Sequence, residues 1–235
     1  MRYDSIQDMK ERGIRVGEML GEGSEKKVFV DPDDKRYAKG IFHEELEESP
    51  NKIKSRFYLT KILHILYPKN VPDIHMSASK PNMLVVDRVE HDKAQQIHKE
   101  IIRVNDMIVI HGGIATKEER ETLDRLNKEL SVERDDRYDK SNKKLIDFLK
   151  EMEKLKVTVD ISWFNFSYDK EGNPVYVDSF EPFFAYGTSW GFSRGRIELA
   201  IDELEDEIKK KKAMKYLNRL IALSVAENKS TGGRN

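Results

Sequence analysis

Cysteine is absent from this chain of 235 residues, which excludes disulfides, thiolate nucleophiles and cysteine-ligated zinc sites. Long apolar runs are absent too, since no stretch approaches the roughly 20 residues that a membrane-spanning helix needs. The segment that begins with Met1 also lacks the apolar core of a signal peptide. We therefore expect a soluble, cytoplasmic protein that has no membrane partner.

An excess of charge of either sign is also missing, because 42 basic side chains face 43 acidic ones and the net charge is −1. Proteins that bind nucleic acid draw most of their affinity from neutralising phosphates, so we do not expect a nucleic-acid partner. What the chain does contain is 38% hydrophobic and 36% charged residues. That balance supplies an apolar core under a charged surface, in a length that suits two small lobes.

The pattern of residues changes from strand-like to helical near residue 90. In the first part, β-prone runs and turn formers predict four strands and one helix, at 28–30, 37–42, 50–66 (the helix), 74–78 and 83–89. The second part has helical periodicity, broken by a hairpin pattern between residues 157 and 178. We predict an α+β chain of two lobes, residues 1–90 and 91–235, with a disordered tail at 228–235.

A glycine-rich turn precedes the strand candidate at 28–30 and follows residues from 14 on that also look strand-like. Gly21 and Gly23 carry no Cβ, so the backbone there can approach phosphate groups closely. Lys39 follows on the next strand, where its ammonium group could hold phosphate oxygens as a point charge. The alternative is a plain hairpin with one of the chain's many lysines. This motif on its own does not decide between the two.

Three polar residues surround the later hairpin. Turn formers at 169–174 separate two β-prone runs, so Asn165 and Asp178 come to the same edge, and Asp160 lies on the loop that enters it. Amide and carboxylate oxygens are the ligands that Mg²⁺ prefers, which suits Asn165 and Asp178. Asp160 is then left to orient a substrate hydroxyl, as phosphoryl transfer requires. The alternative is that these aspartates are ordinary solvated turn residues.

The spacing of these residues and the order of the elements resemble the protein-kinase-like superfamily. The resemblance is to its compact, atypical members, the RIO-type kinases and aminoglycoside phosphotransferases, and it implies a two-lobed fold with a small antiparallel sheet lobe and a mainly helical lobe. It also implies that Asp160 is the catalytic base, that Asn165 and Asp178 bind Mg²⁺, and that Gly21, Gly23 and Lys39 hold the phosphates of ATP.

The chain departs from the family pattern at several positions. Lys26 replaces the third glycine of the turn, and Ser179 and Phe180 follow the metal aspartate where the family has Phe-Gly. The predicted helix at 50–66 contains no glutamate that could pair with Lys39, although four glutamates precede it at residues 44, 45, 47 and 48.

The function that these features predict is ATP- and Mg²⁺-dependent transfer of a phosphoryl group to a hydroxyl acceptor, either a small molecule or a protein. Two alternatives stay open. One is a pseudokinase, in which the altered motifs leave only nucleotide binding or scaffolding. The other is a kinase-fold enzyme that transfers a nucleotidyl group.

Overall fold

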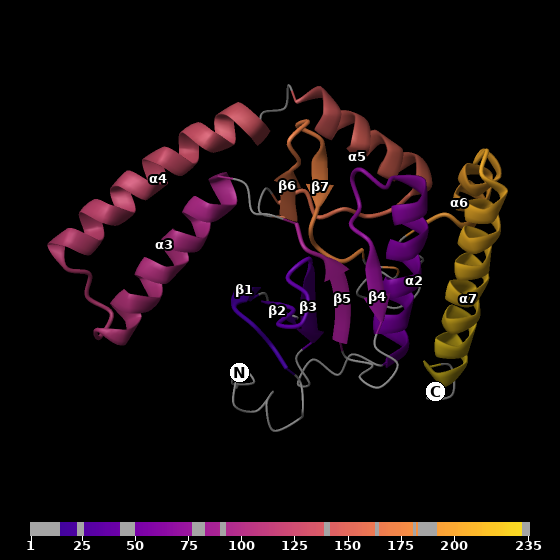
Figure 1. The fold of residues 1–235 in the computed structure, drawn as a ribbon, viewed down its shortest axis with the longest axis horizontal. Coiled ribbons are helices and arrows are strands. Elements are labelled where there is room, and N and C mark those ends of the chain that lie inside the picture. The colour runs from indigo at the N-terminus through magenta and orange to yellow at the C-terminus, as the bar shows by residue number, and fades with distance from the viewer. Residues whose placement is uncertain are drawn as a thin grey trace. The chain divides into compact units, whose positions relative to one another are not determined.

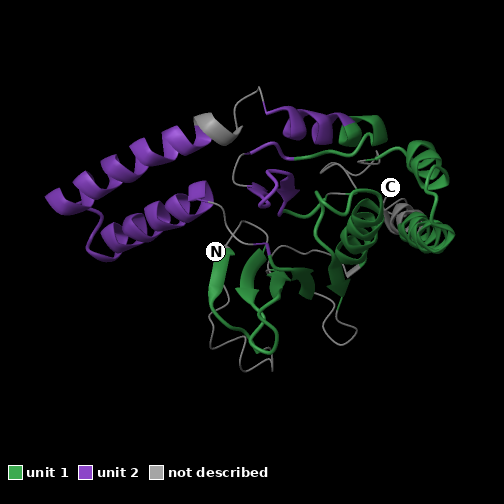
Figure 2. Ribbon diagram, turned by 45° about the horizontal axis from the view of Figure 1, so that its top comes forward, with its two compact units in different colours: residues 1–88, 151–159, 178–235 green, residues 89–150, 160–177 purple. Residues whose placement is uncertain are grey.

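The computed structural model describes residues 15–22, 26–42, 50–76, 83–89, 93–138, 142–162, 165–180, 182 and 192–231. The chain divides into two compact units, which Figure 2 shows in different colours. The first unit contains residues 1–88, 151–159 and 178–235, and the second contains residues 89–150 and 160–177. The predicted boundary near residue 90 is close to the end of the first segment, but the C-terminal helices group with the N-terminal sheet.

The first unit contains a five-stranded antiparallel sheet (Figure 1). The strand order is β1-β2-β3-β5-β4. The first three strands follow one another along the chain, and a helix separates them from the last two. The strands are β1 (Met19–Glu22), β2 (Lys26–Val30), β3 (Tyr37–Phe42), β4 (Ile74–Met76) and β5 (Met83–Asp87).

The two faces of the sheet bury different apolar clusters, because successive side chains of a strand point to opposite sides. One face packs on helix α2 (Pro50–Leu66), where Phe42 and Leu84 meet Ile53. The other face buries Phe29, Ile41 and Met83 in a separate cluster. We call these the α2 face and the opposite face.

Helix α2 also packs along the C-terminal helix α7 (Glu207–Thr231) (Figure 1). The ring of Tyr216 lies 6.2 Å from that of Phe57 and 6.0 Å from that of Tyr58, measured between ring centroids. This packing explains why the C-terminal residues belong to the first unit. A shorter helix, α6 (Arg194–Asp202), precedes α7.

Helix α7 extends into the segment predicted as a tail. The helix continues to Thr231, so residues 228–231 of the segment predicted to be disordered are helical, and residues 232–235 lie outside the described part of the chain. The segment before the predicted tail contains alanine, glutamate and lysine, which are good helix formers and let the helix run on.

The second unit contains a pair of helices and a short hairpin. Helices α3 (Lys93–Ile110) and α4 (Lys117–Tyr138) bury apolar residues at helical spacing between them, namely Ala94, Ile97, Ile101, Leu126 and Leu130. Strands β6 (Phe166–Tyr168) and β7 (Pro174–Tyr176) form the hairpin. Helix α5 (Lys143–Leu155) begins in this unit, and its last residues belong to the first.

A capping box precedes α4. The backbone N–H of Glu119 donates to the hydroxyl of Thr116, and the carboxylate of Glu119 accepts from the backbone N–H of Thr116. The predicted fold class is confirmed as well, since a small antiparallel sheet with one helix is followed by mainly helical segments and a hairpin. Within the described residues, no helix is long and apolar enough to cross a membrane.

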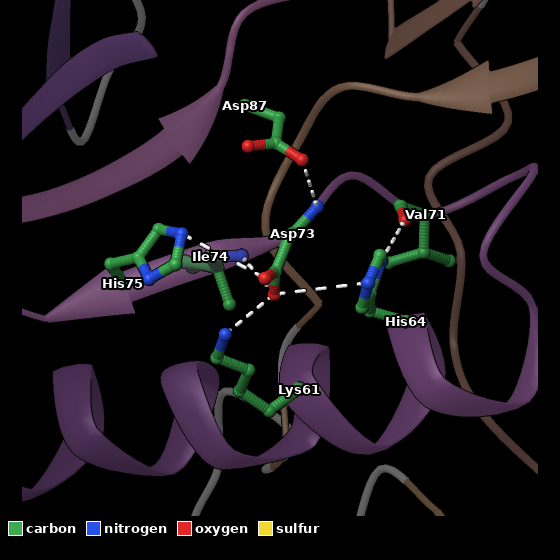
Figure 3. Close-up of polar contacts among 7 residues, drawn as sticks. All are labelled: Lys61, His64, Val71, Asp73, Ile74, His75 and Asp87. Atoms are coloured by element: carbon green, nitrogen blue, oxygen red, sulfur yellow. Dashed lines mark hydrogen bonds and ion pairs between the residues drawn. The ribbon is translucent and has the colours of Figure 1, made fainter. Parts of the chain in front are cut away.

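A polar cluster ties α2 to strand β4 in the first unit (Figure 3). The carboxylate of Asp73 lies 2.5 Å from the ammonium group of Lys61, 3.9 Å from His64 and 3.7 Å from His75. The same carboxylate accepts the backbone N–H of Ile74. Burial raises the pKa of Asp73. The hydrogen bonds and positive charge from these neighbours lower the pKa by more than burial raises it, so the net shift is downward.

Replacement of this carboxylate is expected to destabilise the first unit. Asp73→Asn leaves the ammonium of Lys61, whose side chain is 8% exposed, without its ion-pair partner. We expect a loss of about 2 kcal/mol in the free energy of unfolding at pH 7, the range for hydrogen bonds to charged groups. Chemical denaturation of wild type and variant measures this difference.

The pH dependence of the same comparison tests the cause. A depressed pKa contributes stability that is present above the unfolded value of 3.8 and is lost as the pH falls through the folded value. The gap between wild type and Asp73→Asn should therefore shrink as the pH falls below 3.8. Asp202→Asn, which removes an exposed ion pair with Lys210, should leave stability nearly unchanged. A gap that persists undiminished at pH 2 would contradict the ionic explanation.

Candidate functional site

Asp178 contacts the strand that follows the glycine-rich turn. Lys26, the first residue of β2, places its Nζ atom 3.0 Å from Oδ1 of Asp178 and 3.0 Å from the hydroxyl of Ser179. These residues are more than 150 positions apart in the chain, and all belong to the first unit. The backbone N–H of Ser179 also donates to Oδ1 of Asp178 and helps to orient the carboxylate.

The α2 face carries this contact. Lys26 is paired in register with Phe42, whose ring packs toward α2, and directly opposite residues of antiparallel strands share a face. The ammonium of Lys26 lies 5.9 Å from the centre of the Phe42 ring. The guanidinium of Arg56, a buried residue of α2, lies 5.5 Å from that ring. A partly exposed carboxylate and its cation therefore border the α2 face near Phe42.

Lys39 lies on the opposite face. It pairs in register with Phe29 and Val85, which belong to the opposite-face cluster. Its Nζ atom lies 3.0 Å from Oδ1 of Asp31 and donates to the carbonyl of Arg15 at 3.1 Å. The predicted role of Lys39 in holding phosphates stays a prediction, and these contacts give it a structural role.

The ion pair with Lys39 also acts on Asp31. Burial raises the pKa of the Asp31 carboxyl. The backbone N–H of Asp33 and the ammonium of Lys39 together lower the pKa by more than burial raises it, so the net shift is downward. The carboxylate of Asp31 is thus ionised at neutral pH. It also removes the need for the glutamate that α2 lacks, because Lys39 already has its acidic partner on the face away from α2.

The glycines predicted to approach phosphates are described in part. Gly21 lies in β1, next to Val28 in the register with β2, and a Cβ built on it meets no atom within 4 Å. The backbone beside Gly21 therefore borders open space, as a loop that approaches a ligand requires. Gly23 lies outside the described residues.

Asp160 and Asn165 lie together in the second unit. The amide Nδ2 of Asn165 donates to the carbonyl of Asp160 at 3.4 Å, and Asn165 is 7% exposed. The carboxylate of Asp160 accepts the hydroxyl of Ser162 at 2.6 Å and its backbone N–H at 2.9 Å. These two bonds from Ser162 lower the pKa of Asp160, so its exposed carboxylate is ionised at neutral pH.

The hairpin predicted between these residues is present. Strand β6 follows Asn165 directly, β7 ends two residues before Asp178, and the backbone N–H of Val177 donates to the carbonyl of Asn165 at 2.9 Å. Asp169 shapes the turn by accepting the backbone N–H groups of Glu171 and Asn173. Asp160 and Asn165 belong to one unit and Asp178 to the other, so the two groups are described separately.

Lys26 is a candidate site residue that the sequence analysis noted only as a departure. The signal for it was present, because Lys26 stands where the third glycine of the turn would be. The alternation of side chains between the two faces of a strand gives a second signal. Ala38 and Lys39 are neighbours on β3 and must point to opposite faces, whereas Ala38 and Gly40 share one.

The residues present suit magnesium that is held together with nucleotide phosphates. Among the described residues there is no group of three or more His, Asp or Glu side chains that could hold a metal ion. Magnesium at nucleotide sites needs only one or two protein oxygens, because phosphates and waters complete its shell. Asp178 offers hard oxygen atoms of that kind in the first unit, and Asn165 offers one in the second.

Comparisons with known proteins give a likeness to solved structures. No protein-family model matches the chain, and no curated protein matches it either. Among solved structures, the chain is similar to the streptomycin-ATP-APH(2")-IIa ternary complex, with 12% identity, a TM-score of 0.32, and coverage of 94% of this chain and 91% of that chain. At that similarity the likeness does not decide what this chain binds or does.

Proposed function

We propose that this chain is an ATP- and Mg²⁺-dependent phosphotransferase that moves the γ-phosphoryl group of ATP to a hydroxyl acceptor. The observation that carries the proposal is the contact between Asp178 and Lys26. It joins the aspartate after the β6–β7 hairpin to the strand after the glycine-rich turn, within one compact unit. A phosphate-binding turn, a cation and a hard oxygen ligand are the parts that phosphoryl transfer needs in one place.

The second unit supplies the groups for the acceptor in this proposal. Asp160 is ionised at neutral pH, so its carboxylate can accept a hydrogen bond from an attacking hydroxyl and orient it toward phosphorus. A weakly basic carboxylate is sufficient, because the transition state is largely dissociative and the hydroxyl loses its proton late. Asn165 contributes an amide next to Asp160, held by the bond to that residue's carbonyl.

Magnesium, when bound by Asp178, would neutralise the negative charge of the phosphates. Asn165, which belongs to the second unit, stays a predicted metal ligand. The transfer itself breaks the bond between the γ-phosphorus and the bridging oxygen to the β-phosphate, and forms a bond to the acceptor oxygen. ADP leaves with the electron pair, and the acceptor proton passes to Asp160 or solvent. Gly21, and Gly23 beyond the described residues, would let the backbone approach the phosphates.

Labelled ATP tests the reaction type. The full chain is incubated with Mg²⁺, a library of hydroxyl-bearing metabolites and either γ-³²P-ATP or α-³²P-ATP. Label that reaches an acceptor, or the protein itself, from the γ position alone supports the phosphotransferase. Transfer from the α position would identify a nucleotidyltransferase instead.

Thermal unfolding with Mg-ATP tests the binding step separately. Ligand at about 100 times its Kd stabilises the folded state by about 2.7 kcal/mol, which raises Tm by roughly 5–10 °C for a chain of this length. A shift without transfer of either label would assign the chain to the pseudokinases. No shift with Mg-ATP, Mg-ADP or Mg-GTP would overturn the proposal.

A further inference from the structure

We propose that Lys26 of β2, rather than Lys39 of β3, is the lysine that holds the phosphates of the nucleotide. This inference rests on the proposed function and names the cation of the same site. Three observations support it: the face of the sheet on which each lysine lies, the groups that each ammonium contacts, and the position of Gly40 beside Lys26.

The register of the sheet places the two lysines on different faces. Lys26 pairs with Phe42 on the α2 face, and Val28 and Ala38 share that face by strand parity. Asp178 meets the α2 face through Lys26. Lys39 is on the opposite face, so the sheet lies between its side chain and the α2 face that Asp178 contacts.

The contacts of the two ammonium groups differ in kind. The side chain of Lys39 is 11% exposed. Its ammonium contacts the carboxylate of Asp31 and the backbone carbonyl of Arg15. Lys26 is 19% exposed, and its partners are the proposed metal ligand and the neighbouring hydroxyl of Ser179. Lys39 therefore completes a local ion pair, whereas Lys26 brings positive charge to the residues that would meet the phosphates.

Gly40 leaves β3 without a side chain on the α2 face beside Lys26. A Cβ built on Gly40 would lie 3.7 Å from Cδ of Lys26 and 3.8 Å from the carbonyl oxygen of Leu84. Gly40 shares the α2 face with Ala38, so it occupies the place on β3 from which a lysine would reach that face. The side chain of Lys26 passes beside this empty position. On the α2 face, β2 therefore carries a lysine and β3 carries none.

The exchange of partners gives Lys26 its role on binding. Without nucleotide, Lys26 and Asp178 neutralise each other across 3.0 Å. With Mg-ATP bound, the carboxylate of Asp178 would pair with the magnesium ion, and the ammonium of Lys26 would donate to phosphate oxygens instead. The pair is therefore arranged so that each member meets the part of Mg-ATP that carries the opposite charge.

Matched substitutions of the two lysines test the assignment by isothermal titration of the full chain with Mg-ATP. Lys26→Met should weaken Mg-ATP binding about 10- to 100-fold, the worth of a hydrogen bond between charged groups. Lys39→Met should bind Mg-ATP like wild type but unfold at a lower temperature, because it leaves Asp31 without its partner. Loss of binding in Lys39→Met with normal binding in Lys26→Met would overturn the inference.

A relocated lysine tests whether the ammonium itself is responsible. The double variant Lys26→Met, Gly40→Lys places a lysine on the α2 face from the neighbouring strand, where a Cβ at position 40 would make only ordinary contacts. Recovery of at least about ten-fold in Mg-ATP affinity supports the inference. No recovery in a double variant that unfolds cooperatively would overturn it, since the loss would then have another cause.

The same titration separates this inference from the proposed function. Wild type that binds Mg-ATP, with no difference between Lys26→Met and wild type, overturns the role of Lys26 alone. Wild type that does not bind Mg-ATP overturns the proposed function and this inference with it.

Discussion

Asp178→Ala is expected to lower the rate of phosphoryl transfer by roughly 10³-fold, because several kcal/mol of charge stabilisation depend on the metal that this carboxylate would hold. Nucleotide binding should respond differently. Removal of the carboxylate releases the ammonium of Lys26, which lies 3.0 Å away in the wild type. The freed cation should keep the affinity for ATP in the absence of magnesium at or above the wild-type value.

Two measurements check this pair of effects: steady-state transfer from γ-³²P-ATP with saturating magnesium, and titration with ATP in the presence of EDTA. The control is Asp202→Ala, which removes an exposed carboxylate from the same unit, 3.7 Å from Lys210, and should change neither quantity. Wild-type turnover in Asp178→Ala would remove this residue from the proposed metal site. A simultaneous collapse of ATP binding without magnesium would contradict the release of Lys26.

The elements of the first part of the chain could be predicted because their signals are local. Tyr37–Phe42 and Pro50–Leu66 were predicted with the bounds that the structure shows. Proline at the first position of α2, and Pro68 just beyond its end, mark that helix in the sequence. The capping box at Thr116 is equally local, since both of its hydrogen bonds span three residues.

The grouping of elements into units could not be predicted in the same way. The packing of α7 on α2 joins segments about 150 residues apart, through Tyr216, Phe57 and Tyr58. Helical periodicity shows that each helix has an apolar stripe but does not identify the partner that covers it. The predicted division at residue 90 followed chain order and so assigned α7 to the helical part.

In the candidate site too, features set by nearby residues could be predicted, and features set by strand pairing could not. Spacing around the hairpin predicted that Asn165 precedes one strand and that Asp178 follows the other, and both hold. The choice between two lysines depended on the face of the sheet. Parity within β3 separates Ala38 from Lys39, but only the pairing of Lys26 with Phe42 shows that a lysine of β2 occupies the α2 face.

Asp160→Asn is expected to lower the rate of transfer to the acceptor by about 10²- to 10⁴-fold, the contribution of a positioned acid–base group. Asparagine keeps the shape of the side chain and can still accept the hydrogen bonds from Ser162, so the loop should hold its conformation. It cannot take up the acceptor's proton. Mg-ATP affinity should stay at the wild-type value, because Asp160 acts on the acceptor alone in this mechanism.

The pH dependence of the rate carries the second half of this prediction. The bonds from Ser162 lower the pKa of Asp160 below its ordinary 3.8, so the carboxylate loses its charge only as the pH falls through the lowered value. Wild-type transfer should therefore show no acid limb from Asp160 between about pH 5 and pH 8.

Ser162→Ala removes the bond that lowers the pKa of Asp160 most, so the acid limb of the rate profile should move upward toward pH 3.8. The control is Asp147→Asn, which changes an exposed aspartate on α5 and should leave both the rate and its pH profile unchanged. An acid limb at unaltered pH in Asp160→Asn would assign that titration, and the acceptor proton, to a different group.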